Sequence, residues 1–355
     1  MEAISKLSWI INNACNLKCI HCYPNSGVEI RDAFADEMFE KLVANFNGIT
    51  FRRTFLSGGE PIIDINFYRY LEIAKTISDE VYICSNGTLL NQEKIEELSN
   101  HGVDGVVLSC QTFDIDSSVT IYGNPTVPEY VLNSIKLIQK TDVALSVEIT
   151  ILRQNLDQIE KIVDTLISLG VKSLSFKRLL PVGRGASKDV VITKEENYSL
   201  LNKIYHWQST NSNIRFNVHD PLYGTVLFDH IGKISNDKKI LEWIRGYSCR
   251  AGTKWIGIDP WGNVSPCPIL LYKDMLIGNI LETPLKTILD ESPIIKMFND
   301  LENQVENTSC KYGNFCLGCR ATAIARNGNM FTKDPMCVYK DGVCPIVKMR
   351  GDNQL

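Results

Sequence analysis

The sequence predicts an α/β fold built on parallel strands, either a barrel or a doubly wound sheet. Strand-length apolar runs occur at residues 7–11, 54–57, 81–85, 105–109, 144–150 and 173–177. The segments 32–45, 66–77, 92–100, 127–139 and 156–169 repeat apolar residues near i, i+3, i+4 and i+7, which predicts amphipathic helices. Repeated strand–helix units imply right-handed crossovers between parallel strands. In either architecture, functional side chains are expected at the C-terminal ends of the strands.

The composition excludes several classes of protein. Hydrophobic residues make up 44% of the 355 residues, which is enough for one large domain and a smaller one. The formal net charge is -4 and Lys and Arg form no dense run, so neither a nucleic acid nor an anionic membrane is an expected partner. No apolar stretch approaches a membrane span, and the N-terminal apolar run is too short for a signal peptide. We therefore expect a soluble cytoplasmic protein that acts on a peptide or a small molecule.

The regular alternation ends near residues 179–186, where the chain reads LLPVGRGA. Further helices are expected over 194–208 and 235–245, the second with Ser235 as its N-cap. From Tyr247 onward, cysteine, glycine and proline become frequent. These changes predict a first domain over residues 1–214, a linker region over 215–246 and a cysteine-rich domain over 247–355.

The cysteines fall into two groups separated by a long cysteine-free segment. Of the 12 cysteines, five lie before residue 111 and seven lie between residues 249 and 344. In a chain without a secretory signal, clustered cysteines favour metal or redox sites over disulfides. Cys84 and Cys110 lie in apolar strands, and we expect them to be core residues. The remaining cysteines predict two metal-bearing regions.

Cys15, Cys19 and Cys22 follow the first strand, with three and then two residues between them. Three thiolates at this spacing can meet one face of an iron–sulfur cube, which leaves the fourth iron open to an exogenous ligand. The alternative is a structural zinc site. Zinc would require a closed set of four ligands, so His21 would have to be the fourth.

This spacing after a first strand resembles the signature of the radical S-adenosylmethionine superfamily. Two further motifs resemble that family in order and position: Gly58-Gly59-Glu60-Pro61 after the second strand and Ser85-Asn86-Gly87-Thr88 at the end of the third. The resemblance implies a partial (β/α)6 TIM-like barrel with a 4Fe–4S cluster whose open iron binds S-adenosylmethionine. It makes Cys15, Cys19 and Cys22 the catalytic cluster ligands. It assigns the cofactor contacts to Gly58, Gly59, Glu60, Pro61, Ser85, Asn86 and Ser109.

The chemistry of glycine and of a carboxylate supports the cofactor contacts assigned to the turn at 58–61. Glycine lets a backbone approach a ligand closely, and Glu60 offers a charge-assisted acceptor for an ammonium group. The chain departs from its relatives after the fourth strand, where Ser109-Cys-Gln-Thr replaces the frequent Ser-Leu-Asp-Gly. Glu148 and Arg178 lie on or beside expected barrel strands, and each is either a cofactor contact or an ion-pair partner.

The second cysteine group comprises Cys249, Cys267, Cys310, Cys316, Cys319, Cys337 and Cys344. A strand at 256–260 and a turn at 261–263 predict a hairpin that places Cys249 beside Cys267. Seven thiols suit two clusters better than one. A zinc ribbon or knuckle on Cys310, Cys316, Cys319 and Cys337 is the alternative.

This pattern resembles the SPASM extension of radical enzymes, which carries two auxiliary 4Fe–4S clusters. By that resemblance, Cys249, Cys267 and Cys319 hold the first cluster, and Cys310, Cys316 and Cys337 hold the second. Asn307 stands where relatives have another cysteine. We therefore expect either one auxiliary cluster with an open or non-cysteine site, or only one auxiliary cluster; Cys344 is either the replacement ligand or a free thiol.

Together the two resemblances imply an enzyme that cleaves S-adenosylmethionine to a 5′-deoxyadenosyl radical and abstracts hydrogen from a substrate. A ribosomally made peptide or protein is the expected substrate. The C-terminal pattern also resembles a group that includes decarboxylases of haem-type synthesis, so oxidative decarboxylation of a tetrapyrrole is the alternative. Implied partners are an electron donor such as flavodoxin or ferredoxin and, for a peptide, a separate recognition protein. The alternative from another functional class is a non-catalytic iron–sulfur or zinc-binding protein. The turn at 58–61 argues against it, because such a protein does not need to bind an ammonium group.

Overall fold

The computed structural model describes residues 4–27, 36–232, 237–273, 275–303, 310–312 and 316–339. The described strands are β1 (Lys6–Ile10), β2 (Phe51–Ser57), β3 (Ser78–Ser85), β4 (Gly105–Ser109), β5 (Ala144–Ile151), β6 (Ser173–Arg178), β7 (Arg215–His219), β8 (Trp255–Ile258), β9 (Asn263–Ser265) and β10 (Gly278–Asn279). They form one ten-stranded sheet in the order β10-β9-β8-β1-β2-β3-β4-β5-β6-β7.

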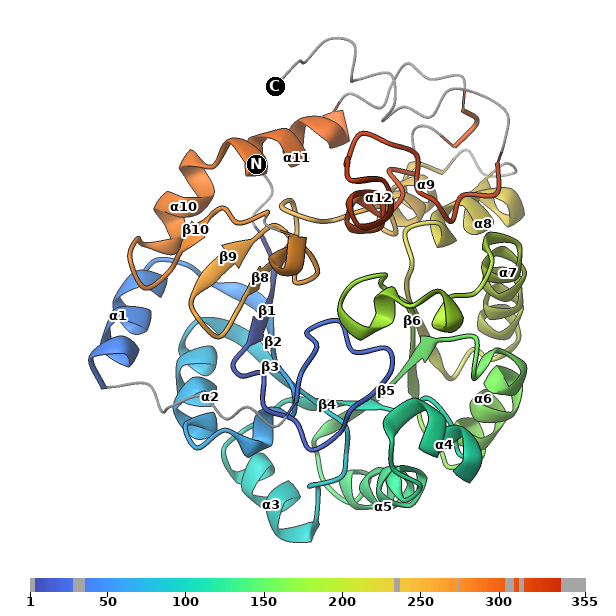
Figure 1. Cartoon of the computed structure of the whole chain (residues 1–355), viewed down its shortest axis with the longest axis horizontal. Helices are drawn as coiled ribbons and strands as arrows, with labels where there is room; N and C mark the ends of the chain where they lie inside the picture. Colours follow the sequence, from blue (N-terminus) through green and yellow to red (C-terminus); the bar gives the residue numbers. More distant parts are fainter. Residues whose placement is uncertain are drawn as a thin grey trace.

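Strands β1 to β7 are parallel and curve into a barrel, with helices outside it (Figure 1). The helices of this part are α1 (Asp36–Phe46), α2 (Phe67–Thr76), α3 (Gln92–Asn100), α4 (Ile115–Tyr122), α5 (Val127–Ile138), α6 (Ile159–Ser168) and α7 (Lys194–Thr210). The predicted barrel is confirmed, and six of its strands lie where the sequence predicts them. The seventh parallel strand, β7, lies in the region that the sequence predicts to begin a linker.

On β6 and β7, apolar residues on the outer face alternate with polar residues on the inner face. On β6, Phe176 is buried and stacks on Trp207 of α7, with ring centroids 6.1 Å apart, so its neighbour Lys177 faces the barrel lumen. On β7, Phe216 and Val218 are buried, whereas Arg215, Asn217 and His219 alternate with them. This polar alternation explains why β7 lacks the apolar run by which the other strands are found.

The C-terminal part continues the barrel sheet instead of standing apart from it. It contains α8 (Tyr223–His230), α9 (Lys238–Arg245), α10 (Leu285–Glu291), α11 (Pro293–Asn303) and α12 (Arg320–Asn327). Strand β8 pairs in parallel with β1 and antiparallel with β9, which confirms the predicted hairpin. A second small core lies here, formed by buried residues that include Leu270, Phe298 and Met330. The cysteine-rich part is therefore joined to the barrel by backbone pairing as well as by packing.

Some residues that the sequence singles out lie outside the part of the chain that the structure describes. Helix α9 begins after Asp237, whose side chain accepts a hydrogen bond from the Lys239 N–H at 2.9 Å. The expected N-cap, Ser235, lies outside the described residues, as do Asn307 and Cys344. Within the described part of the chain, no helix combines the length and apolar character that a membrane crossing requires.

Candidate active site

The loop after β1 carries Cys15, Cys19 and Cys22 and crosses the opening of the barrel (Figure 1). A bridge between Ala14 and Gly27 closes the loop, and the Cys15 N–H donates to the Gly27 carbonyl at 2.6 Å. The thiols accept from backbone N–H groups: Leu17 donates to Cys15 at 3.4 Å, and Ser26 donates to Cys22 at 3.3 Å. Such donors stabilise sulfur in its thiolate form.

The three thiols of this loop are electrostatic neighbours. The pKa of Cys19 is raised first by burial and then by Cys15 and Cys22, and none of the three is in a disulfide. Across the described residues, no group of three or more Cys, His, Asp or Glu side chains is arranged around one metal-ion position. An iron–sulfur cube does not need such convergence, because each thiolate binds a different iron.

Glu60 lies at the end of β2, and its side chain is completely buried. Its Oε2 atom accepts hydrogen bonds from the Ser85 hydroxyl at 3.1 Å and the Asn86 N–H at 2.8 Å. Its Oε1 atom is buried and has no hydrogen-bond partner among the described residues. Burial raises the pKa of Glu60 to about 7. A buried carboxylate oxygen without a donor is unfavourable, so this atom marks a place where a cationic ligand group fits.

Gly58 and Gly59 pack directly against the backbone that leads into the cysteine loop. The Gly59 N–H donates to the Asn12 carbonyl at 3.1 Å, and the Glu60 N–H donates to the Ala14 carbonyl at 2.8 Å. A Cβ on Gly59 would lie 2.0 Å from the Ala14 carbonyl oxygen, which no rearrangement of side chains relieves. The glycines therefore allow β2 and the cysteine loop to approach each other, which places Glu60 near Cys15. Pro61 is buried at the start of the 3-10 turn Pro61–Ile63.

The turn after β3 meets the same loop from the other side. The Asn86 amide donates to Asn16 at 3.0 Å and lies 3.9 Å from the Cys15 sulfur. The Ser85 hydroxyl accepts from the Gly87 N–H at 3.0 Å and is buried. Ser85 therefore positions Glu60 and the turn, while Asn86 reaches the cysteine loop itself.

The barrel lumen beyond the loop carries an ion pair on adjacent strands. Lys177 of β6 lies 3.3 Å from the Glu148 carboxylate of β5, and both side chains are partly exposed to the lumen. Burial would raise the pKa of Glu148, but its interactions with neighbouring side chains, of which the Lys177 charge is the strongest, outweigh burial and lower that pKa. Burial would lower the pKa of Lys177, but Glu148 outweighs it and raises that pKa. Both groups therefore stay charged at neutral pH.

Other side chains join this lumen surface from neighbouring strands. His219 of β7 is paired with Lys177 in the sheet register, and enclosure lowers its pKa to about 4, so its imidazole is neutral at pH 7. Ser109 of β4 is paired with Glu148. The sequence predicts that Cys84 is a core residue, but this prediction is wrong: Cys84 is half-buried, because it lies two residues after Tyr82 on the inner face of β3. Cys110 is fully buried, as the sequence predicts. No motif in the sequence identifies Lys177 and His219 as site residues. The alternation of polar and apolar residues along a strand is the signal that could have found them.

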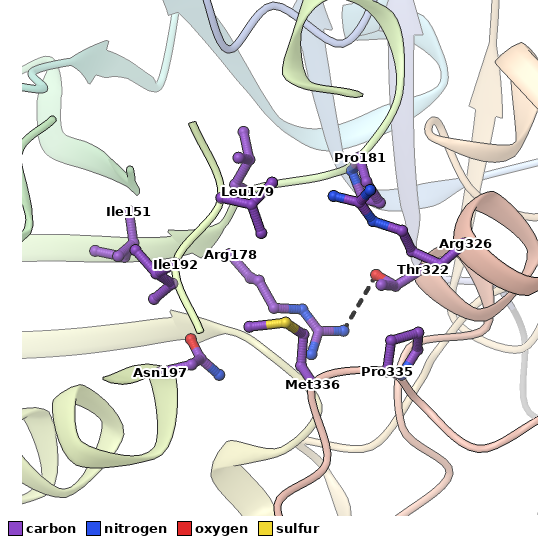
Figure 2. A pocket seen from close by; sticks show the side chains of 11 residues that line it. Ile151, Arg178, Leu179, Pro181, Ile192, Asn197, Thr322, Arg326, Pro335 and Met336 are labelled. Atoms are coloured by element: carbon purple, nitrogen blue, oxygen red, sulfur yellow. Dashed lines mark hydrogen bonds between the residues drawn. The ribbon is translucent and has the colours of Figure 1, made fainter. Parts of the chain in front are cut away.

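Arg178 faces away from the lumen and forms a buried ion-pair network. Its guanidinium lies 3.2 Å from Asp220 and 2.9 Å from Asp334, and each of the three side chains is at most 4% exposed. It also donates to the Thr322 hydroxyl of α12 at 3.3 Å, at the wall of a pocket between the barrel and α12 (Figure 2). Of the two roles open for Arg178, the structure supports the ion-pair partner.

The structure brings Cys249, Cys267 and Cys319 to one place in the C-terminal part. All three contact the second core, in which Cys319 is buried at the N-cap of α12. Burial is the largest cause that raises the pKa of Cys249, and the Cys319 thiol adds to it. The same holds for Cys267, where burial comes first and Cys319 and Cys249 add to it. Cys316 and Cys337 instead contact the main core. The assignment of the cysteines to two separate clusters stays a prediction.

Comparisons with known proteins find similarity in both parts of the chain. Residues 9–166 match the model of the radical SAM superfamily, and residues 249–320 match that of the SPASM iron–sulfur cluster-binding domain. The AdoMet-dependent heme synthase of Methanosarcina barkeri is 26% identical, over 95% of this chain and 97% of that protein. The mycofactocin maturase MftC of Mycolicibacterium smegmatis is 24% identical, over 99% of this chain and 86% of that protein. The crystal structure of Streptococcus suis SuiB bound to its precursor peptide SuiA shares the fold, with a TM-score of 0.76 at 19% identity over 96% of this chain and 77% of that chain.

Proposed function

We propose that this chain, an enzyme that carries a radical SAM domain followed by a SPASM domain, cleaves S-adenosylmethionine at a 4Fe–4S cluster on Cys15, Cys19 and Cys22. The observation that carries the proposal is the unpaired, buried Oε1 atom of Glu60 beside the cysteine loop. The ammonium group of the cofactor's methionine supplies the donor that this atom lacks. A non-catalytic electron carrier has no use for such an acceptor.

The residues of the chain divide the work between two sides of the lumen. When bound, the cluster and S-adenosylmethionine together supply a 5′-deoxyadenosyl radical that abstracts hydrogen from carbon. The ends of β1, β2 and β3 hold the cysteines, Glu60 and Asn86. The opposite wall, on β5, β6 and β7, presents Glu148, Lys177 and His219 to the substrate. Enclosure by the barrel keeps bulk water from the reacting carbon.

The proposed substrate is a ribosomally made peptide or protein, which makes the chain a maturase. The likeness to MftC, a protein named as a maturase, supports this substrate, and the fold is shared with SuiB, which was crystallised with a precursor peptide. A tetrapyrrole is the second candidate, because a heme synthase matches this chain over nearly its whole length. The proposed partners are an electron donor such as flavodoxin or ferredoxin and, for a peptide, a recognition protein.

An isotope experiment tests both the activity and the substrate. The anaerobically reconstituted protein is reduced with dithionite and given S-adenosylmethionine, and 5′-deoxyadenosine is measured by mass spectrometry. The reaction is repeated with a deuterated precursor peptide and with a deuterated iron tetrapyrrole that carries propionates. Deuterium in 5′-deoxyadenosine identifies the substrate. An iron-replete protein that forms no 5′-deoxyadenosine under any condition would contradict the proposal.

Affinity for S-adenosylmethionine should depend on pH through Glu60. The pKa of this carboxyl is raised to about 7 by burial, and its ionised form is the one that accepts an ammonium. The acid form dominates below that pKa, so the apparent affinity should fall by about tenfold from pH 8 to pH 6. Titration of the iron-loaded protein by calorimetry measures this. Glu60→Gln should bind more weakly and show a flat pH profile. Glu93→Gln, at an exposed position of α3, should bind like the protein without substitutions.

Replacement of Lys177, the cation of the barrel lumen, should lower product formation but not the cleavage of S-adenosylmethionine. In Lys177→Met, Glu148 loses its partner and the substrate loses a wall contact. We expect product formation to fall by roughly a hundredfold, because misplacement at the reacting carbon is costly. Formation of 5′-deoxyadenosine without substrate should continue at its normal rate. The exposed Lys172→Met variant is the control. Equal loss of both activities in Lys177→Met would place this residue at the cofactor instead.

A further inference from the structure

The segment after β6 lies directly on the cysteine loop. The 3-10 turn at Gly183–Ala186 follows Val182, and its Arg184 N–H donates to the Cys22 carbonyl at 3.0 Å. Gly183 has a φ of +57°, and a Cβ there would lie 2.5 Å from the carbonyl oxygens of Cys22 and Tyr23. The glycine therefore permits a contact between two backbones that are far apart in the sequence.

One guanidinium holds the loop on both sides of its third cysteine. The Nε atom of Arg184 donates to the Cys19 carbonyl at 2.7 Å. Its Nη1 atom donates to the Ser26 carbonyl at 2.8 Å and to the Asn25 side chain at 3.1 Å. Asn25 has a positive φ of 56°, a left-handed conformation that is uncommon for a residue other than glycine. A rigid, planar donor set of this kind fixes several acceptors at once, which a lysine ammonium on a flexible stem does less well.

The charge of Arg184 is directed to the loop and to no carboxylate. Within the described part of the chain, Asp and Glu oxygens form no ion pair with Arg184. Its acceptors are the two carbonyls and the amide oxygen of the loop. A positive charge beside an iron–sulfur cluster favours the reduced form, which carries one more electron, and so raises the reduction potential.

We propose that Arg184 is the positioning residue of the radical cluster: its hydrogen bonds set the places of Cys19 and Cys22, and its charge raises the reduction potential of the cluster. This inference rests on the proposed assignment of the cluster to Cys15, Cys19 and Cys22. It gives a role to residues 183–185, Gly-Arg-Gly, which belong to none of the cysteine or cofactor motifs.

Two substitutions separate the hydrogen bonds from the charge. Arg184→Gln removes the charge and most of the donors, whereas Arg184→Lys keeps the charge and loses the planar donor set. Each full-length variant is reconstituted anaerobically, and iron and sulfide per chain are counted. The cluster is then titrated by redox poise, following the electron paramagnetic resonance signal that changes when S-adenosylmethionine is added. Because that change requires an open iron, it distinguishes the radical cluster from clusters that are fully ligated.

In Arg184→Gln, the ratio of reduced to oxidised radical cluster at a fixed poise should fall by about tenfold, and iron occupancy should decrease. In Arg184→Lys, that ratio should stay near the original while occupancy decreases. Arg153→Gln, which breaks a surface pair with Glu196, should change neither quantity. An Arg184→Gln protein with full iron and an unchanged reduced-to-oxidised ratio would overturn the inference. If the protein without substitutions shows no electron paramagnetic resonance signal that responds to S-adenosylmethionine, the assignment of the cluster to Cys15, Cys19 and Cys22 is refuted instead.

Discussion

Replacement of Cys15, Cys19 and Cys22 with Ala should abolish the formation of 5′-deoxyadenosine. The loop that carries them is closed by backbone hydrogen bonds and does not depend on the thiols for its contacts with β2. The variant should therefore fold and lose about four irons per chain, because one cube leaves with its ligands. Mass spectrometry of the nucleoside products and iron counting on the same preparation measure both effects.

The same variant reports on the C-terminal clusters. Cys249, Cys267 and Cys319 lie together at the second core, to which none of the three loop cysteines belongs, so their iron should be retained. About eight remaining irons would indicate two auxiliary clusters and about four would indicate one. Zinc without iron would contradict the SPASM assignment. Cys110→Ala, at a buried cysteine that belongs to none of the predicted ligand sets, is the control and should cleave S-adenosylmethionine normally. Undiminished cleavage by the triple variant would refute the assignment of the radical cluster.

The sequence predicts those parts of the site that depend on short segments at strand ends. The cysteine spacing, the turn at 58–61 and the turn at 85–88 each follow a strand, and parallel strands bring their C-terminal ends together. The structure adds the reason for the glycines. Gly59 is needed because the Ala14 carbonyl occupies the space of a side chain, whatever the ligand. Gly59→Val is therefore a poor probe of cofactor binding, because it would displace the cysteine loop first.

The contacts that the sequence does not predict join residues far apart in the chain. Arg184 reaches back to Cys19 across 165 positions, and Arg178 reaches forward to Asp334 across 156 positions. No motif next to either arginine identifies its partner. Strand β7 was missed for a different reason, since its inner residues are polar. The lumen wall needs polar side chains, and that need removes the apolar pattern by which strands are recognised.

Breaking the Arg178 network should cost more stability than other single substitutions away from the cysteines. Arg178→Met leaves Asp220 and Asp334 buried without their cation, and such an uncompensated pair costs about 3–5 kcal/mol. Asp334 also accepts the Cys319 N–H at 2.7 Å and the Met336 N–H at 3.0 Å. The loss should therefore reach the backbone that carries Cys319 and Cys337, and iron in the C-terminal part should fall.

A combined variant tests whether the uncompensated charge is the cause. When Asp220→Asn and Asp334→Asn are added to Arg178→Met, no buried charge is left in the network, so much of the lost stability should return. Hydrogen exchange of α12 and chemical denaturation of the iron-loaded protein measure the effect locally and as a whole. Arg153→Met, which breaks an exposed pair, should cost about 1 kcal/mol or less. If Arg178→Met were as mild as that control, the network would not be what holds the C-terminal part against the barrel. The pairing of β8 with β1 and the packing of the C-terminal part on the main core would then supply that attachment.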